Sequence, residues 1–225
     1  FHLTAAPAPV RIAAEEEIRQ MEALIGTTLD FVDNENRPRL KEPLDLGLLV
    51  EGLVDDFSDM GRDVTLLGAE PVIIAGAMIL LKRRFTNLID NAIEYSPRDG
   101  RIEVDIRTGL SPAEAAASRM TGAARLPLLT PDRGEDLTYA AVTVRDHGPG
   151  MSREHLPRLT ERFYRVEGQK SGERPGTGLG LAIVKHIVNR HRGGLVVESL
   201  PGEGAAFTAF FPLSNRTAVT EPLTV

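Results

Sequence analysis

The sequence contains no cysteine and no tryptophan, and only five of its 225 residues are histidine. The absence of cysteine excludes disulfide bonds and thiolate metal sites, and it fits a protein of a reducing compartment. The histidines are scattered and form no His-x-x-x-His pair. We therefore expect no zinc site.

Long apolar runs are also missing. No segment approaches the roughly 18 consecutive apolar residues of a membrane-spanning helix, and the N-terminus lacks the basic and apolar pattern of a signal peptide. We expect no membrane contact from this chain. If the parent protein is anchored in a membrane, its anchor lies outside this sequence.

The charge balance is mildly acidic. Charged residues make up 26% of the chain and hydrophobic residues 42%, as in an ordinary globular protein with room for one large domain or two small ones. The net charge of −6 argues against the phosphate-backbone binding of nucleic-acid proteins. We therefore expect no nucleic-acid partner.

The first part of the chain predicts a helix from Ile12 to Val32. Its apolar residues recur every three or four positions, which suits a helix bundle: Ile18, Met21, Ile25, Thr28 and Val32. A polar stretch ending in Pro38 interrupts this pattern. We assign 1–36 to a partial helical domain, 37–43 to a linker, 44–214 to a second domain and 215–225 to a tail.

The second domain mixes helices and one-sided strands. Asp45 can cap a first helix that Gly61 ends, and a long helix is expected from about Ala77 to Tyr95. Further elements are a helix over Leu179–His191 and strands over Val64–Leu67, Val72–Ile74, Arg101–Arg107, Tyr139–Arg145, Leu195–Ser199 and Ala206–Phe211. This mixture predicts an α+β fold, a two-layer α/β sandwich.

Two stretches interrupt that pattern. An insertion at 108–137 separates two expected strands, and Ser111 begins a capping-box sequence for a short helix inside it. The insertion reads as surface decoration or, alternatively, as a partner site. The stretch 151–177 between two glycine motifs reads as a lid, with a short helix capped by Ser152.

The long helix carries two stripes. The apolar one comprises Met78, Leu81, Phe85, Leu88 and Ala92, and the polar one comprises Arg84, Asn87, Asn91 and Tyr95. Asparagine is a poor helix former, so two of them one turn apart need a reason. Either their amide oxygens face a cation or phosphates, or they form an exposed polar face.

Two glycine motifs follow. Asp146 ends a strand and precedes Gly148 and Gly150, which offers a carboxylate that accepts from an adenine amino group beside a closely approaching backbone. The alternative is an ordinary turn. The second motif, Gly176-Thr177-Gly178-Leu179-Gly180, opens a helix whose free amides can bind phosphate. Its spacing fits neither a dinucleotide-binding turn nor a P-loop.

Taken together and in this order, the motifs resemble those of sensor histidine kinases over roughly residues 44–213. Asn87-Leu-Ile-Asp-Asn91-Ala-Ile-Glu-Tyr95 resembles their N box, and Asp146-His-Gly-Pro-Gly150-Met151 resembles their G1 box. Glu161-Arg-Phe163-Tyr164-Arg165 is similar to the F box, and Gly176-Thr-Gly-Leu-Gly180 to the G2 box.

The resemblance implies a Bergerat-fold domain that binds ATP and Mg²⁺. It gives the metal to Asn91, the triphosphate region and a catalytic role to Asn87, the adenine amino group to Asp146, and the lid anchor to Phe163. The full set of implied nucleotide-binding residues is Arg84, Asn87, Asn91, Tyr95, Asp146, Gly148, Gly150, Phe163, Arg165, Lys170, Gly176, Thr177, Gly178, Leu179 and Gly180.

The same resemblance implies a protein-histidine kinase. Hydrolytic relatives carry a water-activating glutamate where Asn87 stands, and an amide is no general base at neutral pH. The γ-phosphoryl group would pass to a histidine and then to a response regulator receiver domain. The parent would be a homodimer through its helical domain, anchored in the bacterial inner membrane, with this part in the cytoplasm.

Departures from the family pattern leave alternatives open. Glu94 stands where a phosphate-reaching cation is usual, so Arg84 or the lid cations Arg165, Lys170 and Arg174 must compensate, or affinity is reduced. The helix Ile12–Val32 resembles the second helix of the acceptor hairpin. The acceptor histidine is therefore expected upstream of Phe1, with His2 as the alternative. Other functions weighed are a nucleotide-binding module without turnover and an anti-sigma serine kinase.

Overall fold

The computed structural model describes residues 42–68, 70–97, 100–131, 137–166 and 178–214. The chain divides into two units, Phe1–Arg39 and Leu40–Val225, and the described residues all belong to the second. The expected helix Ile12–Val32 and its linker therefore lie outside the described residues. Within the described ranges, no helix combines the length and apolar character needed to span a bilayer.

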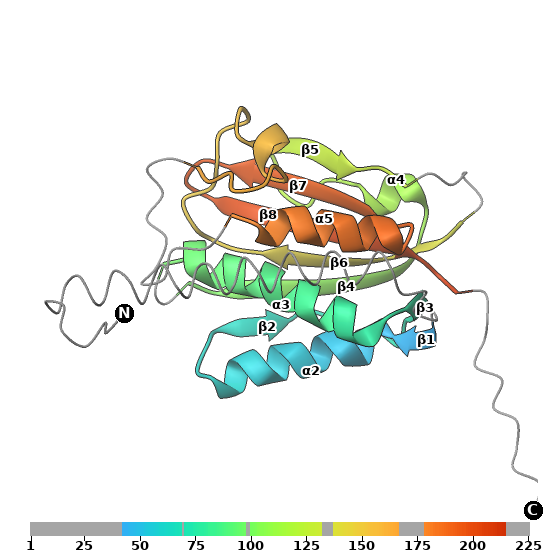
Figure 1. The fold of residues 1–225 in the computed structure, drawn as a ribbon. Coiled ribbons are helices and arrows are strands. Elements are labelled where there is room, and N and C mark those ends of the chain that lie inside the picture. The colour runs from blue at the N-terminus through green and yellow to red at the C-terminus, as the bar shows by residue number, and fades with distance from the viewer. Residues whose placement is uncertain (1–41, 69, 98–99, 132–136, 167–177, 215–225) are drawn as a thin grey trace, which may run out of the picture. The chain divides into compact units, whose positions relative to one another are not determined.

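A six-stranded sheet forms one layer and helices cover one of its faces (Figure 1). The strand order is β2-β4-β6-β8-β7-β5, and all neighbours are antiparallel except β2 and β4. The strands are β2 (Val64–Leu66), β4 (Ile102–Leu110), β5 (Ala124–Leu129), β6 (Tyr139–Arg145), β7 (Gly194–Leu200) and β8 (Gly204–Pro212). A second small sheet pairs β1 (Glu42–Asp45) with β3 (Ile73–Gly76). The predicted two-layer α/β sandwich is confirmed.

Three helices, α2 (Leu46–Asp59), α3 (Met78–Tyr95) and α5 (Gly180–Arg190), lie on the covered face (Figure 1). Asp45 caps α2 as predicted, because its Oδ1 accepts from the Leu48 amide at 3.2 Å. Gly61 follows the end of α2 with a φ of +76°, which a residue without a Cβ adopts freely.

The apolar stripe of α3 is largely as predicted. Leu81, Phe85, Leu88 and Ala92 are buried, and the ring of Phe85 meets Phe211 edge to face at 6.1 Å. The prediction is wrong for Met78, which is 58% exposed at the first turn of the helix and does not belong to the buried stripe. The core between α3 and the sheet therefore begins with Leu80 and Leu81.

The insertion contains more structure than the sequence indicates. The short helix α4 (Pro112–Ala115) forms with the predicted capping box at Ser111. Strand β5, which the sequence does not predict, pairs antiparallel with β7 and becomes an edge of the sheet. On the sheet face opposite the main core, a second apolar cluster comprises Ala115, Tyr139, Ala141, Val196 and Phe210. The insertion is thus an integral part of the domain.

Candidate functional site

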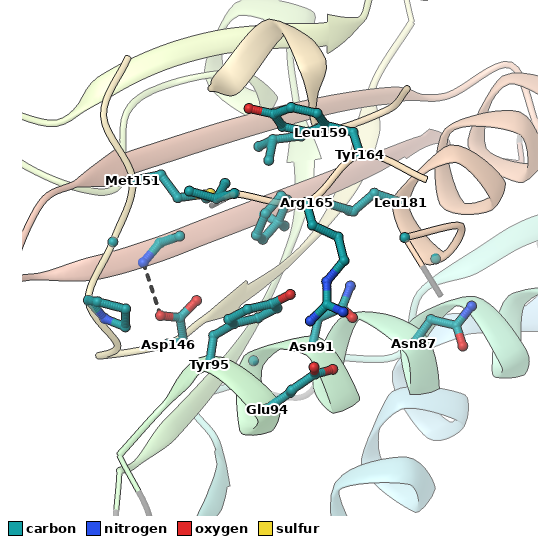
Figure 2. Close-up of a pocket in the computed structure, with 18 residues that line it drawn as sticks. Asn87, Asn91, Glu94, Tyr95, Asp146, Met151, Leu159, Tyr164, Arg165 and Leu181 are labelled. Atoms are coloured by element: carbon teal, nitrogen blue, oxygen red, sulfur yellow. Dashed lines mark hydrogen bonds between the residues drawn. The ribbon is translucent and has the colours of Figure 1, made fainter. Parts of the chain in front are cut away.

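A pocket opens between α3, the loop after β6, the chain before residue 167 and the start of α5 (Figure 2). Four of the sequence motifs contribute to it. Its lining comprises Asn87, Asn91, Ala92, Glu94, Tyr95, Asp146, Pro149, Gly150, Met151, Leu159, Tyr164, Arg165, Val166, Gly178, Gly180, Leu181, Ala205 and Phe207.

The polar stripe of α3 supplies one wall. Asn87, Asn91 and Tyr95 lie one turn apart and all line the pocket (Figure 2). Asn91 faces the beginning of α5, since a Cβ added at Gly180 would lie 3.6 Å from Asn91 Nδ2. The two amide side chains thus stand where the helix N-terminus and its free backbone amides begin.

Arg84, expected on the same stripe, does not line the pocket. It is only 4% exposed, and its Nε has no hydrogen-bond partner among the residues that the structure describes. Helix α5 packs along α3. Its first residue, Gly180, lies beside Asn91, and at the N-terminal end of α3 the His191 Nε2 accepts from the Ala77 amide at 3.2 Å. The stripe is therefore covered by α5 at Arg84 and open only from Asn87 onward.

Replacing Arg84 with methionine tests this correction. Burial, followed by repulsion from Arg83, lowers the pKa of Arg84 to about 10, so the charged form is disfavoured in the fold. We expect Arg84→Met to stabilise the domain by about 1 kcal/mol or more at pH 7, measured by urea unfolding. Nucleotide affinity, measured by calorimetry, is expected to stay within about twofold of the parent. A loss of tenfold or more would return Arg84 to the phosphate site.

Asp146 forms the floor of the pocket. It is 6% exposed, and its Oδ1 accepts from the backbone amides of Gly148 at 2.9 Å and Ala205 at 3.2 Å. Within the described part of the chain both hydrogen bonds fall on Oδ1, so Oδ2 is left to accept from a ligand (Figure 2). A carboxylate held this way selects a ligand that presents an N–H donor.

Burial raises the pKa of the Asp146 carboxyl above its usual value. The amides of Gly148 and Ala205 act in the opposite direction, as do the nearby His147 and Arg145, but they are weaker. The fold therefore holds this carboxylate at a cost in stability, which is a pattern typical of binding sites.

The loop after Asp146 needs glycine at two positions. A Cβ at Gly148 would collide with the carbonyl oxygen of Tyr95, and one at Gly150, where φ is +63°, would collide with the carbonyl oxygen of Leu200. Gly150 lines the pocket. Gly148 does not, and it acts instead by donating its amide to Asp146.

Ser199 of β7 fastens the same loop to the sheet. Its Oγ accepts from the Met151 amide at 2.7 Å and donates to the Gly204 carbonyl at 2.9 Å, and the residue is fully buried. This serine is not part of any motif, so sequence reasoning missed it. It holds the pocket-lining Met151 in place through the backbone.

We expect Ser199→Ala to lower the free energy of unfolding by about 1–3 kcal/mol, because the Met151 amide loses its acceptor. Urea unfolding measures the loss. Ser58→Ala is the matched control, since the Ser58 hydroxyl donates to Val64 from an exposed position where water can replace it. Equal effects of the two substitutions would contradict the anchoring role.

The opposite wall is the lid stem, which we define as residues Ser152–Val166. It contains a 3-10 turn, η2 (Leu156–Arg158), that begins later than the expected helix, and Ser152 donates to Glu154 instead of capping it. The Tyr164 hydroxyl lies 2.7 Å from His155 Nδ1, and the Arg158 guanidinium lies over the Tyr164 ring at 4.1 Å. Tyr164 thereby lines the pocket in a fixed orientation.

The ring of Phe163, expected to anchor the lid, is 58% exposed and does not line the pocket. Its backbone adopts a φ of +66°, and its amide donates to the Gly178 carbonyl at 3.0 Å. A Cβ at Gly178 would approach the Phe163 backbone to 2.8 Å, so the two backbones pack directly. Here the main chain of Phe163 fixes the stem.

Charged groups meet at the pocket mouth. Arg165 extends from the lid stem toward Asn91 and Glu94, and all three line the pocket (Figure 2). Burial and then Glu94 raise the pKa of Tyr95, and a hydrogen bond from Arg165 acts against that rise. A cation thus faces Glu94 across the site.

The glycine-rich motif is only partly described. Gly178 and Gly180 line the pocket, whereas Leu179 is buried and does not. Gly176, Thr177 and Lys170 lie outside the described residues. The missed lining residues are mainly apolar: Ala92, Pro149, Met151, Leu159, Tyr164, Val166, Leu181, Ala205 and Phe207. Their apolar character suits a flat aromatic base, but isolated apolar residues in a sequence carry no such signal.

The side chains of the pocket determine which metal ion it could bind. Among the described residues, no three His, Cys, Asp or Glu side chains are grouped to hold one. The Asn87 and Asn91 amides instead offer oxygen ligands of the kind that Mg²⁺ accepts alongside substrate phosphates. A metal that arrives with a triphosphate fits this arrangement.

Comparison with known proteins finds one matching family and several similar sensor proteins. Residues 76–215 match the model of the family described as "Histidine kinase-, DNA gyrase B-, and HSP90-like ATPase". The phosphate regulon sensor protein PhoR of Pseudomonas aeruginosa is 34% identical over 178 residues, covering 77% of this chain and 34% of that protein. The swarming motility regulation sensor protein RssA of Serratia marcescens is 36% identical over 190 residues, covering 78% and 34%.

A solved structure, the mycobacterial sensor histidine kinase MprB, superimposes with a TM-score of 0.53 at 25% identity, covering 77% of this chain and 98% of that one. The chain spans about a third of the length of the curated relatives it matches.

Proposed function

The chain belongs to the histidine kinase-, DNA gyrase B- and HSP90-like ATPase family and is the ATP-binding domain of a sensor histidine kinase. We propose that its pocket binds ATP together with Mg²⁺ and that the domain transfers the γ-phosphoryl group to a histidine. The observation that carries the proposal is the buried Asp146 at the pocket floor, whose Oδ2 accepts no hydrogen bond from the described residues.

Asp146 recognises the base in this proposal. Its Oδ2 accepts from the exocyclic amino group of adenine and repels the carbonyl oxygen that guanine presents at the same place. The neighbouring Met151, Leu159 and Phe207 supply apolar contacts for the ring faces. The domain is therefore selective for ATP over GTP.

The α3 amides serve the triphosphate end. Asn91 supplies an oxygen ligand to Mg²⁺, Asn87 orients the phosphates, and the metal supplies charge neutralisation on the phosphate oxygens. Gly178 and Gly180 allow backbone amides to approach closely. Asn87 cannot act as a general base toward water, so the γ-phosphoryl group persists until an imidazole nucleophile is positioned.

Arg165 is the cation that compensates for Glu94 in this proposal. It lines the pocket, whereas the other described candidate, Arg84, is covered by α5. A guanidinium has several donors in a fixed fork and suits phosphate oxygens. Roles for Lys170, Gly176 and Thr177 remain predictions from the motif.

The partners of the whole protein follow from the family. Sensor histidine kinases in general dimerise and act on response regulators. We propose that the parent of this chain is a homodimer through its helical domain, with its anchor in the inner membrane and this domain in the cytoplasm. The phosphate passes from the acceptor histidine, upstream of Phe1 or at His2, to a receiver-domain aspartate.

Labelled ATP tests the activity. The chain is mixed with γ-labelled ATP and a separate acceptor hairpin of a sensor kinase, and label on the hairpin in acid-labile form is the expected result. Acid-stable label would indicate a serine kinase instead. Nucleotide binding without any label transfer, to this hairpin or to His2, would indicate a binding module.

A further inference from the structure

Strand β5 of the insertion contacts the lid stem at η2, although the two segments are separate in sequence. After β4, the helix α4 packs on the outer sheet face against β4 and β6, and the chain then crosses to β5 at the sheet edge. The gold turn of η2 lies against β5 (Figure 1). Strand β5, which belongs to no recognised motif, therefore supports the lid stem, which is one wall of the pocket.

The crossing is held by a buried carboxylate on β7. Glu198 is 1% exposed and accepts hydrogen bonds from the Ser118 hydroxyl and, at 2.7 Å, from the Arg119 amide. Glu198 and Ser199 are adjacent and point to opposite faces of the sheet. Glu198 thus holds the insertion on one face of the sheet, and Ser199 holds the Met151 loop on the other face.

Strand β5 is in register with this part of β7. Ala124 lies opposite Ser199, and Leu126 lies opposite Val197. Leu128 is 8% exposed and belongs to the main core, to which the fully buried Leu156 of η2 also belongs. Strand β5 contacts the η2 turn, and its core-facing side, with Ala124, Leu126 and Leu128 in or against the main core, forms the apolar seat of that turn.

The η2 turn in turn fixes the pocket side of the lid stem. His155 hydrogen-bonds with the Tyr164 hydroxyl, Arg158 lies over the Tyr164 ring, and Leu159 follows the turn directly. Tyr164 and Leu159 both line the pocket. A displacement of η2 would move both of them together.

We propose that β5 positions the lid stem, so that the described part of the insertion, residues 108–131, determines how long the pocket retains nucleotide. The inference rests on the proposed nucleotide binding for its kinetic consequence but not for its structural one. Without the seat on β5, the turn loses its apolar support and the Tyr164 wall becomes mobile. Nucleotide then leaves faster while the α3 amides and Asp146 are untouched.

Leu128→Ala tests the proposal, with Leu53→Ala as the control. Leu53 is a leucine of α2 that is also buried, at 2% exposure against 8% for Leu128, and lies outside the pocket lining. Two rates are measured on the full chain: release of a fluorescent ATP analogue, and trypsin cleavage after Arg153 and Arg158, the latter without nucleotide. We expect Leu128→Ala to speed both by roughly tenfold and Leu53→Ala to change neither by more than about twofold.

The outcomes separate the inference from the proposed function. If both variants release the analogue and are cleaved at equal rates, β5 does not position the stem. If the parent chain binds no analogue, the proposed function fails, and the cleavage rates alone still decide the positioning role.

Discussion

Asp146→Asn is expected to weaken ATP binding by about 10- to 150-fold while making the unliganded domain more stable at neutral pH. The affinity falls because an amide places a donor where the adenine amino group also donates, and a hydrogen bond to a charged group contributes about 1.5–3 kcal/mol. Calorimetry with ATP and Mg²⁺ measures this loss. Asp55→Asn, at an exposed position of α2, is the control.

The gain in stability follows from the raised pKa of Asp146. Because the pKa is higher in the folded state than in the unfolded state, the folded state binds the proton more tightly. The stability contribution of the protonated carboxyl is complete below the unfolded pKa and is lost as the pH rises through the folded pKa. At pH 7 the ionised carboxyl therefore destabilises the fold, and asparagine removes that charge.

Urea unfolding at several pH values tests the linkage. Asp146→Asn is expected to exceed the parent in free energy of unfolding at pH 7, with a difference that shrinks as the pH falls toward 4. A variant that loses both affinity and stability at pH 7 would show that Asp146 serves the fold and not the ligand.

Asn91→Ala is expected to slow phosphoryl transfer to the acceptor hairpin by about 10²- to 10³-fold, because charge neutralisation by a bound metal contributes several kcal/mol to such a transition state. The rate is measured at saturating ATP. Affinity for ATP with and without Mg²⁺ is measured alongside, and the variant is expected to lose most of the effect of the metal. Adenine contacts at Asp146 should be preserved.

The control for this substitution is Asn189→Ala, which removes an exposed asparagine from α5. It should leave transfer and magnesium dependence unchanged. If Asn91→Ala retains the full effect of Mg²⁺ on affinity, Asn91 is not the metal ligand, and the Asn87 amide becomes the candidate.

The regular elements that carry the site are predictable from periodicity. The long apolar stripe of α3 and the one-sided alternation of β4 each fix both the element and its buried face. The motif positions then follow, since Asn87, Asn91 and Asp146 all line one pocket. Local pattern suffices here because each element buries a continuous apolar face.

Strand β5 is not predictable in the same way. It reads Ala-Arg-Leu-Pro-Leu-Leu, and a proline normally argues against a strand interior. Pro127 is tolerated because β5 is an edge strand, bonded on one side only to β7. That position depends on the order of the strands in the sheet, which no local pattern contains.

The prediction that Arg84 faces the nucleotide is wrong because of the tertiary structure as well. Its spacing from Asn87 is correct for the polar stripe, but α5 covers that stripe along the first half of α3. Ser199 is missed for a similar reason, because its contact with Met151 joins residues 48 positions apart. Helical spacing identifies a face but not what covers it.

In the proposed function, the Asp146 carboxylate selects an adenine nucleotide in this pocket. Calorimetric titration of the parent chain with ATP and, separately, with GTP, both in the presence of Mg²⁺, measures this selectivity. Heat of binding with ATP and none with GTP at the same concentrations is the expected result. No heat with ATP, or equal affinity for the two nucleotides, would contradict it.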